Sequence, residues 1–167
     1  MVMTWVKQQK KATVLTVLAV LSVCAVTGYA AHVRDKSGHL WDDQVFYQIA
    51  TGDHDWNDTD TYGYHYMNVE NDLNTWVELT YKWKHELKQE DVVLKSDEIG
   101  NKGRPLRIES GETYSTSGWL NTYTAGGIPD GEYKIVSSTK IKLENGQGFI
   151  QDWIPISQTT KFTVEEE

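Results

Sequence analysis

Residues 75–84 read Thr-Trp-Val-Glu-Leu-Thr-Tyr-Lys-Trp-Lys, and this stretch decides the fold class. Polar or charged side chains alternate with apolar ones at Val77, Leu79, Tyr81 and Trp83. Successive side chains of a β-strand point to opposite faces of its sheet, so a period of two is typical of a strand with one buried face. The stretch therefore predicts an antiparallel strand packed on a core.

The same period recurs along the chain. Residues 132–143 place on one face Tyr133, Ile135, Ser137, Thr139, Ile141 and Leu143. Shorter strands are expected at 44–50, 62–69, 92–95, 106–109, 114–124, 149–154 and 161–165. Turn residues such as Gly, Pro, Asn and Asp separate these segments. About seven to nine strands of this kind predict an all-β antiparallel sandwich, with a core built on Trp76 or Trp83, Trp119, Tyr133 and Phe162.

The N-terminus has the features of an export segment. Three lysines within residues 7–11 precede an uncharged, largely apolar run over 12–31, which ends in small residues. This order is typical of a cleaved signal peptide. A retained membrane anchor is the alternative, because 17 apolar residues reach the lower limit for spanning a bilayer. We therefore expect a signal peptide or anchor helix over 1–31, a polar linker over 32–43 and a sandwich domain over 44–167.

Charge and cysteine content limit the partners. The 167 residues carry 16 Lys and Arg against 24 Asp and Glu, a net charge of −8, and loss of residues 1–31 would lower it to −11. So acidic a chain is not expected to bind nucleic acid. The single cysteine, Cys24, lies in the export segment. These features fit a bacterial protein that is secreted or anchored on the outer face of the cytoplasmic membrane, and that contacts the membrane only through an uncleaved N-terminus.

Residues 106–141 carry a family resemblance. They include Leu106-Arg-Ile-Glu-Ser-Gly-Glu-Thr113, then Ser117-Gly-Trp-Leu120, then Ile128-Pro-Asp-Gly-Glu-Tyr-Lys-Ile135. The Pro-x-Gly-x-Tyr turn resembles the tyrosine corner of immunoglobulin-like sandwiches, in which a Tyr hydroxyl bonds to nearby backbone. The series as a whole is similar to the intracellular proteinase inhibitor domains of bacilli. The resemblance implies an immunoglobulin-like fold and a loop that docks onto a partner, but no inhibitory residue corresponds.

Residues 52–63 form an unusually acidic segment. Its carboxylates are Asp53, Asp55, Asp58 and Asp60. Ca²⁺ takes six to eight oxygen ligands, which such a segment can supply, although Val69 stands where an EF-hand needs Glu. The alternative is a solvated loop in which Asp and Asn make turns. Ca²⁺ is therefore the one cofactor that the sequence suggests.

Aromatic side chains gather just after this segment begins. Those expected to bind a partner are Trp56, Tyr62, Tyr64 and Tyr66. Three tyrosines two residues apart share one strand face, where they either stack on sugar rings or centre a protein contact. The alternative is that they pack in the core, because strands favour aromatic residues.

No catalytic motif is complete, so we do not expect an enzyme. The favoured function is an exported, non-catalytic sandwich that binds a protein or a cell-envelope polymer. Two alternatives stay open. One is a carbohydrate-binding protein or a small hydrolase that uses carboxylates of residues 53–60. The other is a surface or matrix protein that self-associates through its edge strands.

Overall fold

The structure is a computed structural model that describes residues 32–57, 60–101, 103–124 and 129–164. Within these ranges the chain forms nine β-strands and no helix. The strands are β1 (His32–Leu40), β2 (Val45–Asn57), β3 (Asp60–Asn71), β4 (Val77–Gln89), β5 (Val92–Gly100), β6 (Leu106–Ile108), β7 (Thr113–Thr124), β8 (Gly131–Asn145) and β9 (Ile150–Val164).

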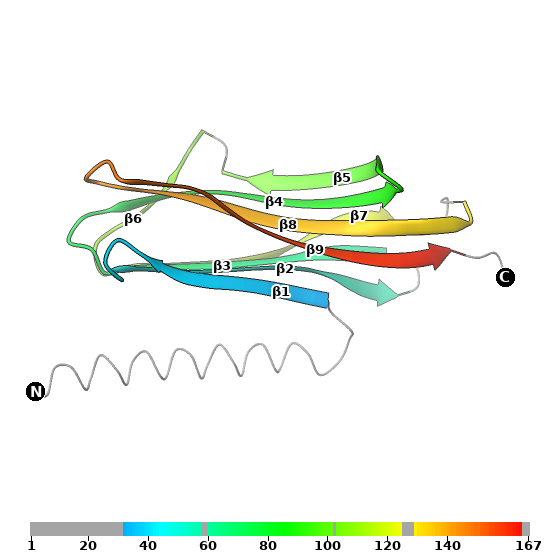
Figure 1. Ribbon diagram of the computed structural model, residues 1–167, viewed down its shortest axis with the longest axis horizontal. Helices are drawn as coiled ribbons and strands as arrows, with labels where there is room; N and C mark the ends of the chain where they lie inside the picture. The colour runs from blue at the N-terminus through cyan, green and yellow to red at the C-terminus, as the bar shows by residue number, and fades with distance from the viewer. Residues whose placement is uncertain (1–31, 58–59, 102, 125–128, 165–167) are drawn as a thin grey trace, which may run out of the picture. The chain divides into compact units, whose positions relative to one another are not determined.

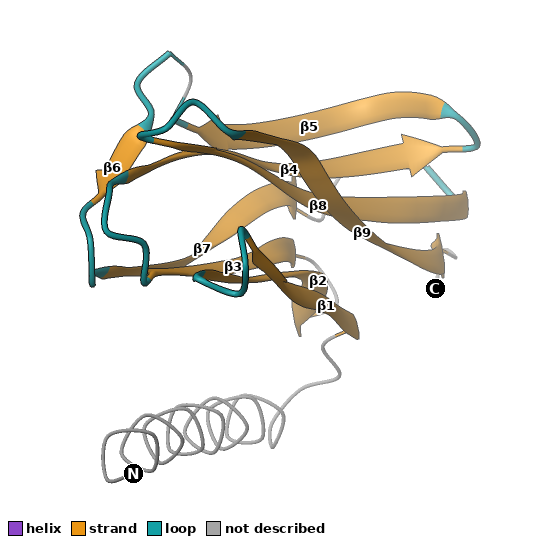
Figure 2. Cartoon of the chain, turned by 60° about the vertical axis from the view of Figure 1, so that its left-hand side comes forward, coloured by secondary structure: helices purple, strands orange, loops and turns teal. Residues whose placement is uncertain are grey.

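The strands form two antiparallel sheets that pack as a sandwich (Figure 1). Sheet A has the order β1-β2-β3-β7, and sheet B has the order β5-β4-β8-β9, with the short β6 also paired to β4. Figure 2 shows the two layers from another side. The predicted all-β sandwich is confirmed, and the strand number lies at the upper end of the expected range.

The alternation in the sequence corresponds to burial in the structure. Along β8, every second residue from Tyr133 to Asn145 is buried, and the residues between them are partly exposed. On β4, Val77, Leu79 and Trp83 are likewise buried. Both strands therefore present one face to the interior, as their period of two predicts.

Two apolar clusters fill the interior. The larger one draws on both sheets and includes Val45, Ile49, Met67, Val69, Val77, Leu79, Trp83, Leu120, Ile141, Leu143 and Ile154. The smaller one consists of Leu87, Tyr133 and Ile135, with Phe162 and Val164 packed against it. Burial of these side chains is the main term that stabilises the fold.

Two expectations differ from the structure. Residues 32–40, expected to lie in a polar linker, form β1, which pairs with β2 along its whole length. An edge strand that is exposed on most of its surface needs no apolar alternation, so the sequence of β1 lacks the period of two that predicts a strand. Trp119, expected in the core, is 53% exposed, because its position on β7 points away from sheet B.

The turn that enters β8 has the contact that the tyrosine-corner resemblance implies. The hydroxyl of Tyr133 donates a hydrogen bond to the carbonyl of Pro129, with 2.6 Å between the oxygens. Tyr133 is 3% exposed and stacks on Phe162. This bond holds the start of β8 against the preceding turn. Membership of the immunoglobulin-like superfamily stays a prediction.

The expected signal peptide or anchor over 1–31 lies outside the described residues. In the ranges that are described, no helix is long and apolar enough to cross a bilayer.

Candidate functional site

The tyrosines of β3 lie on the outer face of sheet A. Gly63, His65 and Met67 point inward and are buried, whereas Tyr62, Tyr64 and Tyr66 alternate with them and are partly exposed. The prediction that these tyrosines share a face is confirmed, and the face is the outer one rather than the core. Each of these three side chains is therefore partly accessible to solvent on that face.

Trp119 extends this row onto the neighbouring strand. It lies directly opposite Tyr64 in the pairing of β3 with β7, and the ring centroids are 5.0 Å apart at an interplanar angle of 51°. We call Tyr62, Tyr64, Tyr66 and Trp119 the aromatic strip. Burial, with a smaller effect of Tyr66, raises the pKa of Tyr64. Its hydroxyl therefore stays protonated and can donate a hydrogen bond at neutral pH.

Small and uncharged residues surround the aromatic strip. Tyr64 lies opposite Gly52 on β2, while Tyr66 lies between Ala50 on β2 and Ser117 on β7. Neither Gly52 nor Ala50 has a side chain large enough to cover an adjacent ring. Among the described outward positions of sheet A, the carboxylates are Asp35 and Glu70. The surface thus offers ring faces, hydroxyls and amides, with little charge.

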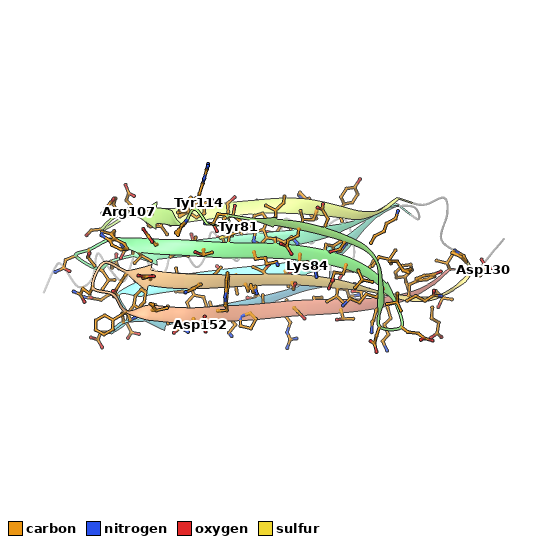
Figure 3. All side chains as sticks on the ribbon, turned by 90° about the horizontal axis from the view of Figure 1, so that it is seen from above. Tyr81, Lys84, Arg107, Tyr114, Asp130 and Asp152 are labelled. Carbon is orange, nitrogen blue, oxygen red and sulfur yellow. The ribbon has the colours of Figure 1, made fainter. Side chains whose placement is uncertain are left out.

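The outer face of sheet B is different, and Figure 3 looks down on it with Lys84 labelled. Its outward positions carry Lys82, Lys84, Lys88, Lys134, Lys140, Lys142 and Lys161. Carboxylates accompany them: Lys82 pairs with Glu98, and two lysines pair with Glu86. The sandwich therefore has one nearly neutral aromatic face and one densely charged face.

The other predicted site residues are only partly described. Trp56 lies on β2 at the shift of register between Asp55 and Asn57, outside the side chains that the structure describes. The side chains of Asp55 and Asp60 also lie outside them, as does the whole of Asp58. Most of the expected acidic loop is instead paired β2 and β3 backbone.

Asp53 is the acidic residue of this segment whose side chain is described. Asp53 is 1% exposed. Its Oδ1 atom accepts a hydrogen bond from the hydroxyl of Thr160 at 2.6 Å, and its Oδ2 atom lies 3.7 Å from Nδ1 of His32. Within the described part of the chain, no three His, Cys, Asp or Glu side chains are grouped as metal ligands. The calcium site stays a prediction that depends on the undescribed carboxylates.

A layer of polar residues crosses the interior. It consists of Thr51, His65, His85, Ser137 and Thr139, all at most 1% exposed, and we call it the polar layer. The Nδ1 atom of His65 is 2.9 Å from the hydroxyl of Thr139 and 3.2 Å from that of Thr51. The Nδ1 atom of His85 is 2.7 Å from the hydroxyl of Ser137. The layer therefore joins the two sheets by hydrogen bonds.

The two imidazoles are neutral at pH 7. Burial, with a contribution from His85, lowers the pKa of His65 to about 3. Burial lowers the pKa of His85 to about 4. Among the described side chains, the Nε2 atoms of both histidines and the indole nitrogen of Trp83 are buried without a hydrogen-bond partner. Burial of an unpaired polar atom costs free energy, so the layer is less stabilising than its hydrogen bonds alone suggest.

Glycines on sheet A make room for two rings of β4. A Cβ atom on Gly63 would lie 2.5 Å from Nδ1 of His85, and one on Gly118 would lie 2.7 Å from the ring of Trp83. Only glycine lacks a Cβ atom, so both positions require glycine. The rings of His85 and Trp83 therefore reach the backbone of the opposite sheet.

The contact between Ser137 and His85 does not form a usable nucleophile. A hydroxyl within hydrogen-bond reach of an imidazole is the arrangement of an activated serine. Both residues are 0% exposed, however, and a substrate cannot reach the hydroxyl in this conformation. The pair acts as a structural contact between β4 and β8.

Sequence reasoning missed Trp119 and the polar layer. Ser137 and Thr139 share the inward face of their strand with apolar residues. Two hydroxyls in an otherwise apolar row are the sequence signal that could have indicated buried polar contacts. His65 likewise alternates with the outward tyrosines. Nothing in the sequence says that these residues meet across the two sheets.

Comparisons with known proteins do not identify a family for this chain. No family model matches the chain, and no curated protein matches it. The structure is similar to a crystal structure from Archaeoglobus fulgidus, with 12% identity, a TM-score of 0.39, and coverage of 83% of this chain and 100% of that one. It is also similar to a Bacteroides uniformis β-glucuronidase, with 18% identity, a TM-score of 0.36, and coverage of 69% of this chain and 13% of that one. At TM-scores this low, neither similarity carries an argument about function.

Proposed function

We propose that this chain is an exported, non-catalytic, immunoglobulin-like β-sandwich that binds a partner of the cell envelope through the aromatic strip. The observation that carries the proposal is the outward row of aromatic rings on sheet A, with Trp119 53% exposed beside Tyr64. Contiguous aromatic side chains on an exposed strand face are typical of a surface that binds a partner.

Of the two partner classes that the sequence suggests, a neutral envelope polysaccharide fits this face best. Sugar rings present C–H groups that pack on aromatic faces and hydroxyls that exchange hydrogen bonds with amide and hydroxyl side chains. Ser115 and Ser117, both exposed, supply hydroxyls beside the aromatic rings. A strongly charged partner would find few counter-charges here, because the lysines lie on the opposite face.

The direction of export rests on the sequence. The basic and apolar features of residues 1–31 are typical of a signal peptide or anchor, and both of these place the sandwich outside the cytoplasm. The immunoglobulin-like assignment rests on the resemblance over residues 106–141 and is supported by the hydrogen bond from Tyr133 to Pro129.

The test is a binding measurement with the full-length chain on purified cell-wall polysaccharides and on neutral glycans. We expect Trp119→Ala and Tyr64→Ala each to weaken binding by roughly tenfold, the loss of an aromatic residue at the centre of a contact. Binding should change little between low and high salt, because no ion pairs carry it.

Trp153→Ala is the matched control. Trp153 is an exposed tryptophan on sheet B, 38% exposed, with the Lys140 ammonium 4.5 Å from its ring centroid. This variant should bind like the unchanged protein. The proposal is wrong if no glycan or wall polymer binds, or if Trp153→Ala weakens binding as much as Trp119→Ala does.

A further inference from the structure

The two sheets have five edge strands among the described residues, and four of them contain charged residues or proline, which hinder pairing with another chain. Unpaired backbone groups at a sheet edge attract a further strand unless charge, proline or a bulge blocks it. The edge strands are β1 and β7 in sheet A, and β5, β9 and the three-residue β6, which contains Arg107, in sheet B.

Strands β1 and β9 are protected. Arg34, Asp35 and Lys36 place charges along β1, and the Arg34 guanidinium donates a hydrogen bond to the carbonyl of Ser157 on β9. Strand β9 contains Pro155, which has no backbone N–H, and its pairing with β8 shifts register near its start.

Strand β5 is protected in another way. Its pairing with β4 shifts register between Leu87 and Lys88, and this irregularity distorts the edge. Lys95 and Asp97 lie on its inward side, opposite Leu87 and His85. Inward-pointing charges on an edge strand oppose extension of the sheet, because pairing would bury them.

Strand β7 differs from the other edge strands in lacking both charge and proline along its whole length. Its twelve residues, Thr-Tyr-Ser-Thr-Ser-Gly-Trp-Leu-Asn-Thr-Tyr-Thr, include no charged residue and no proline. The one irregularity in its pairing with β3 lies near its end, beyond Asn121. Residues of both its faces are accessible: Ser115, Ser117 and Trp119 are exposed, and Thr116 and Gly118 are partly so.

We propose that β7 is a dimerisation edge that pairs antiparallel with β7 of a second copy of this chain. The inference does not depend on the ligand proposed above. Of the nine described strands, β7 is the one without a charged residue. When two β7 strands pair, no charged side chain is therefore brought to the new contact.

Symmetry restricts the register of this pairing. Residues that lie opposite each other in an antiparallel pair point to the same face of the sheet. The two-fold axis, which passes between the two strands, must therefore place one residue of β7 opposite the same residue of the second copy. Centring the pair on Gly118 aligns residues 113–123 of the two copies, as many as centring it on Trp119 does, and it avoids placing the two indoles directly opposite each other. Trp119 then lies opposite Ser117 of the second copy, whose small side chain leaves room for the indole.

The dimer would join two copies of sheet A into one eight-stranded sheet. The two aromatic strips would lie on the same outer face, with Trp119 of each copy at the junction. Pairing would also satisfy the backbone groups at the free edge of β7.

The experiment is sedimentation velocity of the full-length chain in mild detergent over a range of protein concentrations. We expect a monomer–dimer equilibrium, which Ser115→Lys and Ser117→Lys each shift to monomer. Both positions are exposed, and an edge lysine blocks strand pairing without disturbing the core. The matched control is Ser37→Lys, an exposed serine on β1 at the other edge of the same sheet, which should dimerise normally.

Hydrogen exchange identifies the interface. Amides of β7 should become more protected as the concentration of the unchanged chain rises, and should not do so in Ser117→Lys. The proposal is overturned if the chain is monomeric throughout, if dimers persist in both β7 variants, if Ser37→Lys dissociates the dimer equally, or if an edge other than β7 gains the protection. Assemblies that grow beyond a dimer would contradict the two-fold pairing.

Discussion

The polar layer lies on β2, β3, β4 and β8, and the larger apolar cluster occupies neighbouring stretches of these four strands together with residues of β6, β7 and β9. Both are buried to a similar degree. In the apolar cluster, any well-fitting hydrocarbon stabilises the fold, and the contribution does not depend on pH. In the polar layer, each group depends on its partner and on its protonation state, so its contribution depends on conditions.

Acidification should give the largest difference between the two regions. Both histidines have a folded-state pKa well below the ordinary value of 6.5, so the unfolded chain takes up their protons first. The stability that these neutral histidines allow is fully present above about pH 6.5, and it is lost as the pH falls toward 4. We expect a loss of about 3 kcal/mol in the free energy of unfolding for each imidazole by pH 4.

Denaturant unfolding at a series of pH values measures this loss. The double variant His65→Gln and His85→Gln is the control, because it cannot bind these protons and should show a much flatter profile between pH 6.5 and 4. If the variant and the unchanged chain have parallel profiles, the histidines are not buried as neutral groups.

Truncation in the apolar cluster should have the next largest effect. Leu79 is 0% exposed, and Leu79→Ala leaves a cavity that lowers the free energy of unfolding by about 2–5 kcal/mol. The loss should be the same at pH 7 and pH 5, which separates it from the polar layer. Ile150→Ala, at a residue 57% exposed, should change the free energy by less than about 0.5 kcal/mol. Equal losses in the two variants would contradict this description of the core.

A single hydroxyl of the polar layer should have the smallest effect. Ser137→Ala removes the partner of Nδ1 of His85, and we expect a loss of about 1–2 kcal/mol at pH 7. Ser138→Ala changes the neighbouring, partly exposed residue of β8 and should cost less than about 0.5 kcal/mol. Thermal unfolding compares the two variants directly, and an equal effect would mean that the inward hydrogen bond adds nothing.

These two regions also show how far the sequence could be read. The alternation in residues 75–84 and 132–143 predicts β4 and β8, because local backbone geometry alone sets that period. The same rule predicts the shared face of Tyr62, Tyr64 and Tyr66. It does not tell the inner face from the outer one, since aromatic rings suit both. Trp119 was misplaced for that reason.

Other features depend on contacts that sequence reasoning cannot supply. Strand β1 is defined by its hydrogen bonds to β2, and its polar sequence resembles a linker. The meeting of His65 with Thr139, 74 positions apart in the chain, requires the packing of one sheet on the other. A periodic pattern identifies which residues share a strand face, but not what lies across from them.

The rings of His85 and Trp83, which enter the spaces left by Gly63 and Gly118, have a mechanical consequence. Both rings come from β4, while the two glycines lie on adjacent strands of the other sheet, β3 and β7. A slide of one layer along the strands, or sideways by one strand, would drive a ring into a side chain. The two fitted rings therefore set the offset of the layers in both directions, and the sandwich has a single alignment.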